Sequence, residues 1–424
     1  CIRDRLGAGV VFGPHNGQGW SHIHLAGSAA AAARLMGLSE KRMAHAMAIS
    51  LYQPTYLLWP GFMGPDSKAI TAATPSLIGV QSALLAGQGM TGPLEVIEHP
   101  QGYLAQLSYL PTGFFISGLG RAWVTDTLAY KVYPGCAYID TAVDAVLKLR
   151  ARFHEETGAE LEPDQIREVL VEATILTVEM DHLSRTGESF DLANPVIVNF
   201  SIPASVGIAL LKGRLTAADL SPKALEQDRA ALRELSEKIR LKHDWSLTLR
   251  FLEAQGRVLG FDRIMRQIKL RELLRARSRI QGHYRSSMGF GLGDLKALWT
   301  QVPEARTLLW RWIKQRIKSA AAGGSRRDSP GFDLGDCPLQ NFTMPFAARV
   351  SVTMKNGKIF TELQEVPRGG PGHPLDIIKQ TVLEKYARET DKDLGRKKLE
   401  VILNSADDLE QKLPLKKLLA NCCR

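Results

Sequence analysis

The sequence predicts a mostly α-helical protein in which an all-helical domain is joined to a smaller α+β domain. Residues 1–127 are dense in small and apolar residues at helical spacing. A stretch at 166–180 is rich in β-branched residues, and an Asn-Gly pair at 356–357 lies between two alternating runs. A chain of 424 residues, 45% of them hydrophobic, is long enough to form several domains.

The first predicted domain, residues 1–127, consists of helices that pack closely through small side chains. The segment "SHIHLAGSAAAAARLMGLSEKRMAHAMAISLYQ" predicts two buried helices, with a stop at Gly37 and a new N-cap at Ser39. The segment "SKAITAATPSLIGVQSALLAGQG" predicts a third helix that ends at Gly87 and Gly89.

The α+β domain is predicted in two parts, residues 128–237 and 331–372, with strands contributed by both. In the first part, "IREVLVEATILTVEM" predicts one or two strands. In the second part, "AARVSVTMKNGKIFTELQEV" predicts a hairpin. Residues 373–424 begin with a predicted helix, "HPLDIIKQTVLEKYARET", which we expect to return to the first domain, and they end in a charged tail.

Between these two parts, residues 238–330 are predicted to form a basic helical insertion. The segment from Lys238 to Lys318 holds 19 Lys and Arg residues against 6 Asp and Glu residues, and residues 238–330 include four of the seven tryptophans. An amphipathic lobe with a solvated, arginine-rich face is the favoured interpretation. The alternatives are docking of a partner protein and binding of nucleic acid, the latter disfavoured because no RNP1 or KH signature is present.

Several classes of site and location are disfavoured by the composition. The five cysteines are scattered, with neither a CxxC spacing nor a His pair at zinc distance, so no metal site is predicted and a reducing, cytoplasmic location is expected. The longest low-charge stretch, 51–64, is interrupted by Gln53, Pro54 and Pro60, so no membrane helix is predicted in the chain and no membrane is expected as a partner.

Three motifs in order, "GWSHIHLAGSAAAAARLMGLS", "DSKAITAATPSLIGVQSALLAGQGMTGPLEVIEHPQGY" and "LAYKVYPGCAYIDTAVDAVL", resemble the core motifs of the MmgE/PrpD family. Two later segments, "NFSIPASVGIALLKGRL" and "ARVSVTMKNGKIFTELQEVPRGGPGHPL", are similar to the α+β lid domain of that family. The family includes 2-methylcitrate dehydratase, cis-aconitate decarboxylase and iminodisuccinate epimerase. The resemblance covers most of 19–150, then about 160–220 and 342–390, and leaves the basic insertion and the tail outside.

The resemblance implies a cofactor-free lyase or isomerase for small di- or tricarboxylic acids, with its active site between the helical domain and the lid. In such a site the ammonium of Lys68 would neutralise a substrate carboxylate as negative charge grows on it. Lys131 is expected to act as a second carboxylate clamp or as a proton donor. Asp66, Tyr133 and Cys136 are expected to contact substrate, although packing is the favoured role for the side chains of Tyr133 and Cys136.

Histidines are the expected general bases, because their pKa lies near neutrality. Family members commonly have a histidine directly after the "GW" pair, where this chain has Ser21, so His22 or His24 is expected to substitute. His45 and His99 are expected to be structural. Two further differences from the family lie at Asp140, where a histidine is common, and at Ala204–Ser205, near a common tyrosine.

Only eighteen residues precede the "GW" pair, where the family has a larger helical block that brings an Asp and a His to the site. The N-terminal helical part is therefore expected to be missing here, or to be supplied by a second chain. The resemblance also implies a homodimer formed through the helical domain. The alternative to a dehydratase, decarboxylase or epimerase is a catalytically degenerate subunit or scaffold whose basic insertion docks a partner.

Overall fold

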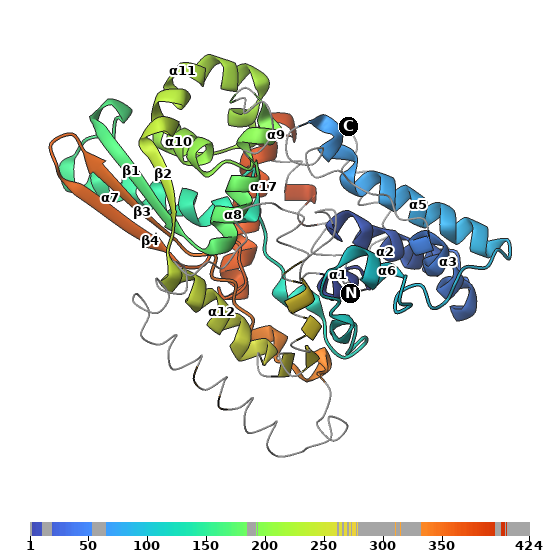
Figure 1. The fold of residues 1–424 in the computed structure, drawn as a ribbon. Helices are drawn as coiled ribbons and strands as arrows, with labels where there is room; N and C mark the ends of the chain where they lie inside the picture. Colours follow the sequence, from blue (N-terminus) through green and yellow to red (C-terminus); the bar gives the residue numbers. More distant parts are fainter. Residues whose placement is uncertain are drawn as a thin grey trace.

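A computed structural model describes residues 2–10, 19–52, 65–184, 194–260 and 332–394, together with single positions at 192, within 263–278, at 310 and 314, and within 400–404. Two bodies lie side by side, helices α2, α3 and α5 in one and a β-sheet with its covering helices in the other (Figure 1). This agrees with the mostly helical, α plus α+β class that the sequence predicts.

The helical domain contains the three helices expected from the small-residue segments. They are α2 (Gly19–Leu35), α3 (Glu40–Tyr52) and α5 (Ile70–Gly87), and α1 (Ile2–Gly9) packs against α2. Gly37 adopts a positive φ of 66° between α2 and α3, and Gly89 one of 99° after α5, so the predicted stops are confirmed. After α5, residues 88–127 contain the short helices α6 (Tyr103–Leu107), η3 (Gly113–Phe115) and η4 (Val124–Thr127), joined by turns and irregular segments.

The contact between α2 and α5 depends on a glycine. A Cβ atom built on Gly79 of α5 would lie 1.9 Å from Ser28 Oγ and 2.6 Å from the carbonyl oxygen of Leu25, both on α2. Because main-chain atoms of α2 approach Gly79 this closely, any larger residue there would force the two helices apart.

The α+β domain is built on a four-stranded sheet in the order β2-β1-β3-β4. The strands are β1 (Ile166–Ala173), β2 (Ile239–His243), β3 (Ala348–Met354) and β4 (Ile359–Gln364); β1 pairs parallel with β2 and antiparallel with β3. The predicted hairpin is confirmed: β3 and β4 are antiparallel, and Gly357 in the turn has a φ of 87°. The prediction that the strands come from both ends of the domain is also confirmed.

One face of the sheet is covered by α7 (Asp140–Thr157), α10 (Ile202–Lys212) and α11 (Pro222–Lys238), as Figure 1 shows. Side chains alternate along β1 and β3 between buried and half-buried or exposed, as expected for strands with a single covered face. Val146 of α7, Ile208 of α10 and Leu232 of α11 meet Val171 and Val350 in one hydrophobic core.

Two sequence predictions in this domain are wrong in detail. Residues 175–184 form a helix, α8 (Ile175–Ser184), instead of a second strand, because β2 and β3 both pair with β1 only as far as Ala173. The predicted insertion boundary at 238 is also too early, because β2 belongs to the sheet and continues into α12 (Trp245–Leu259) through an N-cap at Asp244.

Most of the basic insertion lies outside the described residues, including Trp299 and Trp312. Trp245 is buried against the sheet domain, where its ring meets that of His243, so it is not available for stacking with a base. Ile264 and Ile268 pack into a cluster with Phe115 and Phe332, which anchors the first part of this segment to residues 110–124 and 332–339.

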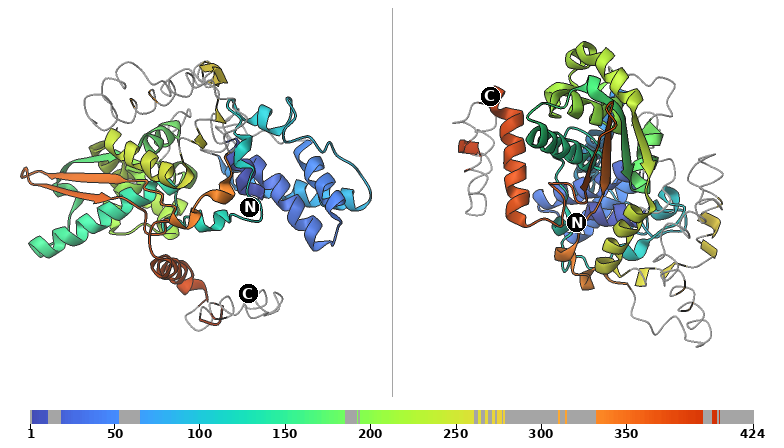
Figure 2. Two further views of the ribbon diagram at one scale, coloured as in Figure 1. Left: turned by 90° about the horizontal axis from the view of Figure 1, so that it is seen from below. Right: turned by 90° about the vertical axis from the view of Figure 1, so that its left-hand side faces the viewer.

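The C-terminal helix is α17 (Leu375–Leu394). Figure 2 shows it apart from the blue helices of the first domain. Its side chains donate to the carbonyl oxygens of Lys131 and Val132, and Glu389 accepts from the amide of Ala217. The sequence predicts that this helix returns to the first domain. The hydrogen bonds described here join it instead to the segment between the two domains and to the α+β domain. The tail after 404 lies outside the described residues.

Among the described residues, one helical stretch, Asp66–Gly87, is long and apolar enough to match a membrane span by length and composition, although no membrane helix is predicted from the sequence. Core helices of water-soluble proteins meet the same criteria, so this stretch does not indicate where the protein resides.

Candidate active site between the two domains

Lys68 lies in η2 (Asp66–Ala69), the turn of 3₁₀ helix that leads into α5. Its half-buried ammonium donates a hydrogen bond of 2.9 Å to Oδ1 of Asn199 and lies 4.2 Å from the centre of the Phe200 ring. Since Asn199 and Phe200 belong to the α+β domain, this side chain bridges the two domains. A lysine at a helix end usually extends into water, whereas this one is directed into the protein.

The turn that receives Lys68 is held rigidly between α9 (Pro195–Val198) and α10. The side chain of Ser201 caps α10 by accepting from the amide of Ala204, and Oδ1 of buried Asp181 accepts from the amide of Ile202 at 2.6 Å. The hydroxyl of Tyr138 donates to the carbonyl oxygen of Phe200 at 2.5 Å. Asn199 and Phe200 are thus presented from a fixed backbone.

Cys136 and Lys131 approach the same point from the segment that precedes α7. The amide of Cys136 donates to the carbonyl oxygen of Asn199 at 2.9 Å. Burial raises the pKa of the Cys136 thiol, although the ammonium of Lys131, the amides of Ala137 and Tyr138 and the ammonium of Lys68 all act to lower it. A thiol with a raised pKa stays protonated at neutral pH and can donate a hydrogen bond.

The ammonium of Lys68 has an altered affinity for protons. Burial, and then the nearby ammonium of Lys131, lower the pKa of Lys68 to about 8, while Cys136 acts in the opposite direction. At neutral pH Lys68 is therefore still mostly charged, but it can release or take up a proton close to neutrality. Lys131 itself is exposed.

The two candidate histidines lie on α2, whereas the residues around Lys68 come from η2, the segment before α7 and the α9–α10 turn. His22 is only 2% exposed, and burial lowers the pKa of its imidazole to about 4, so it is neutral at physiological pH. His24 is half-buried. His45 contacts the backbone of Gly92 through Nδ1, which fits its expected structural role.

Tyr133 and Asp66 occupy different environments from Lys68. Tyr133 is buried, and its hydroxyl donates to Oδ1 of Asp144 at 2.6 Å while accepting from Arg368. Burial, and then the carboxylate of Asp144, raise the pKa of Tyr133. The hydroxyl of Tyr133 is therefore bound by Asp144 and Arg368 and does not point at Lys68. Asp66 is exposed at the start of η2.

Asp140 is the most unusual carboxyl group near the site. It is 2% exposed; Oδ2 accepts from the amide of Val132 at 3.0 Å, while Oδ1 has no hydrogen-bond partner among the described residues. The pKa of Asp140 is raised to about 7: burial is the largest cause, the carboxylate of Asp144 adds to the rise, and the Val132 amide, Lys131 and Lys385 oppose it. Asp140 is thus close to half-protonated at neutral pH.

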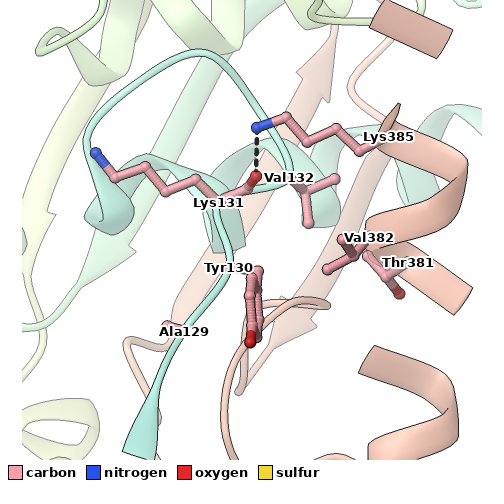
Figure 3. A pocket seen from close by; sticks show the side chains of 7 residues that line it. All are labelled: Ala129, Tyr130, Lys131, Val132, Thr381, Val382 and Lys385. Carbon is pink, nitrogen blue, oxygen red and sulfur yellow. Dashed lines mark hydrogen bonds between the residues drawn. The ribbon is translucent and has the colours of Figure 1, made fainter. Parts of the chain in front are cut away.

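A pocket of about 320 Å³ lies on the other side of the Lys131 backbone, between residues 129–132 and α17. Figure 3 shows the ammonium of Lys385 at its edge, donating to the carbonyl oxygen of Lys131, while the side chain of Lys131 extends away from Lys385. Among the described residues, no group of three or more His, Cys, Asp or Glu side chains is arranged to hold a metal ion.

Asn199 and Phe200 join Lys68, Lys131 and Cys136 at this site, and the sequence did not indicate either of them. Both lie in the motif "NFSIPAS", directly before the Ser201 cap and Pro203. An asparagine at such a position usually stabilises the local turn. Its role as the hydrogen-bond partner of Lys68, which is far away in the sequence, could therefore not be predicted from the motif.

Two family models match the chain in the order of its two domains. The MmgE/PrpD N-terminal domain matches residues 2–112 and the MmgE/PrpD C-terminal domain matches residues 133–272. The second match includes β2 and α12, in agreement with the later start of the insertion found in the structure. A comparison with curated proteins gives no match. The two matches together span more than half of the chain, and the protein therefore belongs to the MmgE/PrpD family, with its dehydratase- and lyase-type fold.

Proposed function

We propose that the protein is a cofactor-free lyase or isomerase that removes a proton next to a carboxylate of a small di- or tricarboxylic acid. The observation that carries this proposal is the arrangement of two lysines, Lys68 and Lys131, with the thiol of Cys136 where the two domains meet. Because the ammonium of Lys131 lowers the affinity of Lys68 for protons, an anionic ligand near both would be bound favourably.

The chemistry follows from where negative charge develops. When a base removes the proton on the carbon next to a carboxylate, the electron pair spreads onto the carboxylate oxygens as an enolate. The ammonium of Lys68, already half-buried and held by Asn199, stabilises that charge more strongly than an ammonium in water would. Lys131 binds a second carboxylate, and Cys136 donates a hydrogen bond from its protonated thiol.

Two outcomes are open to the enolate: loss of a β-hydroxyl, protonated as it leaves as water, gives a dehydratase, and return of a proton to the opposite face gives an epimerase. In a third, related reaction the bond to a carboxylate breaks, carbon dioxide leaves, and the electron pair left on carbon takes up a proton, which gives a decarboxylase. All three require the same cationic stabilisation, so the lysines support the reaction class and do not choose among its branches. We favour the dehydratase or decarboxylase branch.

Turnover of candidate acids in deuterated water tests this function. Purified protein is incubated with cis-aconitate, 2-methylcitrate, citrate and iminodisuccinate, and each is followed by proton NMR. We expect deuterium incorporation, dehydration or loss of carbon dioxide with at least one acid, reduced about 100-fold in Lys68→Met. Lys41→Met, which removes an exposed ammonium from α3, is the matched control and should retain wild-type turnover.

If the folded wild-type protein turns over none of the four acids, the proposal is contradicted. That result would favour the alternative of a catalytically degenerate subunit whose basic segment docks a partner. Equal turnover by the wild type and Lys68→Met would leave a lyase but remove Lys68 from its mechanism.

A further inference from the structure

The backbone that carries Lys131 is held by tertiary hydrogen bonds in place of regular secondary structure. The amide of Tyr130 donates to the carbonyl oxygen of Gly369 at 2.7 Å, and the amide of Val132 donates to Oδ2 of Asp140 at 3.0 Å. A Cβ atom on Gly369 would lie 2.0 Å from the carbonyl oxygen of Tyr130, so this approach requires a glycine.

The two carbonyl groups of this stretch are bound by α17. The ammonium of Lys385 donates to the carbonyl oxygen of Lys131 at 2.6 Å, and Nη2 of Arg388 donates to the carbonyl oxygen of Val132 at 2.9 Å (Figure 3 shows the first of these). Residues three apart on a helix share a face, so α17 presents both donors to the segment together. Hydrogen bonds from charged donors are about twice as strong as neutral ones.

Long cationic side chains on a helix normally extend into water, where their charge is best solvated. Lys385 instead directs its ammonium onto the carbonyl oxygen of the Lys131–Val132 peptide, at the edge of the pocket beside residues 129–132, and Arg388 directs a donor onto the carbonyl oxygen of the next peptide, Val132–Tyr133. With Asp140 on the amide of Val132, both polar groups of the Lys131–Val132 peptide are held, and Arg388 holds the peptide that follows.

We propose that α17 is a positioning element, in which Lys385 and Arg388 hold the Lys131 backbone so that its ammonium faces Lys68 and Cys136. The effect on turnover rests on the function proposed above, whereas the effect on the position of Lys131 does not. A single site would then be formed by residues of both domains and of α17, a helix close to the C-terminal end of the described chain.

A direct readout of this positioning is available without any substrate. The ammonium of Lys131 is one of the causes that lower the pKa of Lys68. If Lys131 loses its support and moves away from Lys68, this repulsion weakens and the pKa of Lys68 rises toward that of an ordinary lysine.

The experiment follows the Cε signal of Lys68 by NMR against pH, in full-length protein labelled with ¹³C-lysine. Loss of the signal in Lys68→Met assigns it. We expect the pKa of Lys68 to rise in Lys131→Met and to rise in the same direction in Lys385→Met and Arg388→Met. Lys385→Arg, which keeps a charged donor, should restore the wild-type titration even if Lys385→Met folds poorly.

The matched control is Lys379→Met, which removes an exposed ammonium from the same helix and should leave the titration of Lys68 unchanged. If the pKa of Lys68 rises in Lys131→Met but not in Lys385→Met and Arg388→Met, the proposal is overturned. No rise in Lys131→Met would overturn it as well, because the two ammonium groups would then not be neighbours.

The same variants separate this inference from the proposed function. If the wild type turns over one of the acids, kcat/KM should fall about tenfold in Lys385→Met and recover in Lys385→Arg. If the wild type turns over none of them, the proposed function fails, and the titration of Lys68 still decides whether α17 positions Lys131.

Discussion

At the scale of single residues, burial at the domain junction changes the chemistry of ordinary side chains. Lys68 and Asp140 each have a pKa moved toward neutrality, with burial as the leading cause for both. Groups of this kind are enriched at functional sites because a proton can move on or off them at little cost near pH 7.

The pKa of Lys68, about 8, predicts a pH dependence of turnover. The proposed role requires the charged ammonium, which is present below pH 8 and is lost as the pH rises through it. We therefore expect kcat/KM to fall about tenfold per pH unit well above pH 8. Lys68→Arg keeps its charge at every accessible pH, so its residual activity should lack this limb. An identical limb in Lys68→Arg would assign the titration to another group.

The raised pKa of Asp140 predicts that the stability of the folded protein depends on pH. Its folded-state pKa, about 7, lies above the value of 3.8 for an ordinary aspartate, so folding favours the protonated form. The wild type should therefore lose stability from this group as the pH rises from about 4 to 7, whereas Asp140→Asn should not. Between pH 5 and pH 8 the variant should gain about 2 to 3 kcal/mol relative to the wild type.

Chemical denaturation at the two pH values measures this difference. Asp164→Asn, an exposed carboxylate of the same domain, is the control and should follow the wild type at both. An equal effect of Asp140→Asn at pH 5 and pH 8 would show that Asp140 is charged throughout.

At the scale of elements, the site depends on helices that approach one another closely. Helix α5 carries η2 and Lys68 at its N-terminal end, and its distance from α2 is limited by Gly79. A change at Gly79 should therefore affect both the stability of the helical domain and the position of Lys68.

We expect Gly79→Ala to destabilise the protein by about 1 to 3 kcal/mol, because the new Cβ meets backbone atoms of α2 that cannot move independently. Gly207→Ala in α10 is the matched control. Its Cβ would meet Leu235 at an ordinary 3.7 Å, and a helical alanine is favoured over glycine by up to about 1 kcal/mol. Thermal or guanidinium unfolding of both variants makes the comparison, and equal stabilities would contradict the close packing of α2 and α5.

At the scale of the whole molecule, one face of α5 is exposed and uncharged. Ile70, Leu77, Val80 and Leu84 recur at helical spacing and all lie on the surface. Exposed apolar patches of this kind mark protein interfaces. Because the face carries no charge of either sign, it can pair with its own copy across a two-fold axis, and we propose a homodimer through α5.

Analytical ultracentrifugation tests the dimer. The wild type should sediment as a dimer, and Leu77→Glu should weaken association at least about tenfold, because each copy would bury a charge opposite its partner's. Leu252→Glu, which changes an exposed leucine on α12, should leave association unchanged. A monomeric wild type would contradict the homodimer and would leave a second kind of chain as the partner for α5.

The sequence alone determined the fold class, the helices of the first domain and the hairpin, because each has a local signal: small residues at helical spacing, capping residues, and Asn-Gly between alternating runs. It also selected Lys68, Lys131 and Cys136 as candidates through a resemblance to the MmgE/PrpD family, and the two family models confirm that the chain belongs to this family.

Only the tertiary structure decided what surrounds these residues. Four features depend on segments far apart in the chain. They are the end of β1 at Ala173, the place of β2 in the sheet, the hydrogen bond between Lys68 and Asn199, and the contacts of α17 with Lys131. Such pairings depend on how whole elements pack, and no short stretch of sequence carries that information. The pKa of Lys68 and Asp140 likewise follows from burial, which exists only once the two domains and α17 have come together.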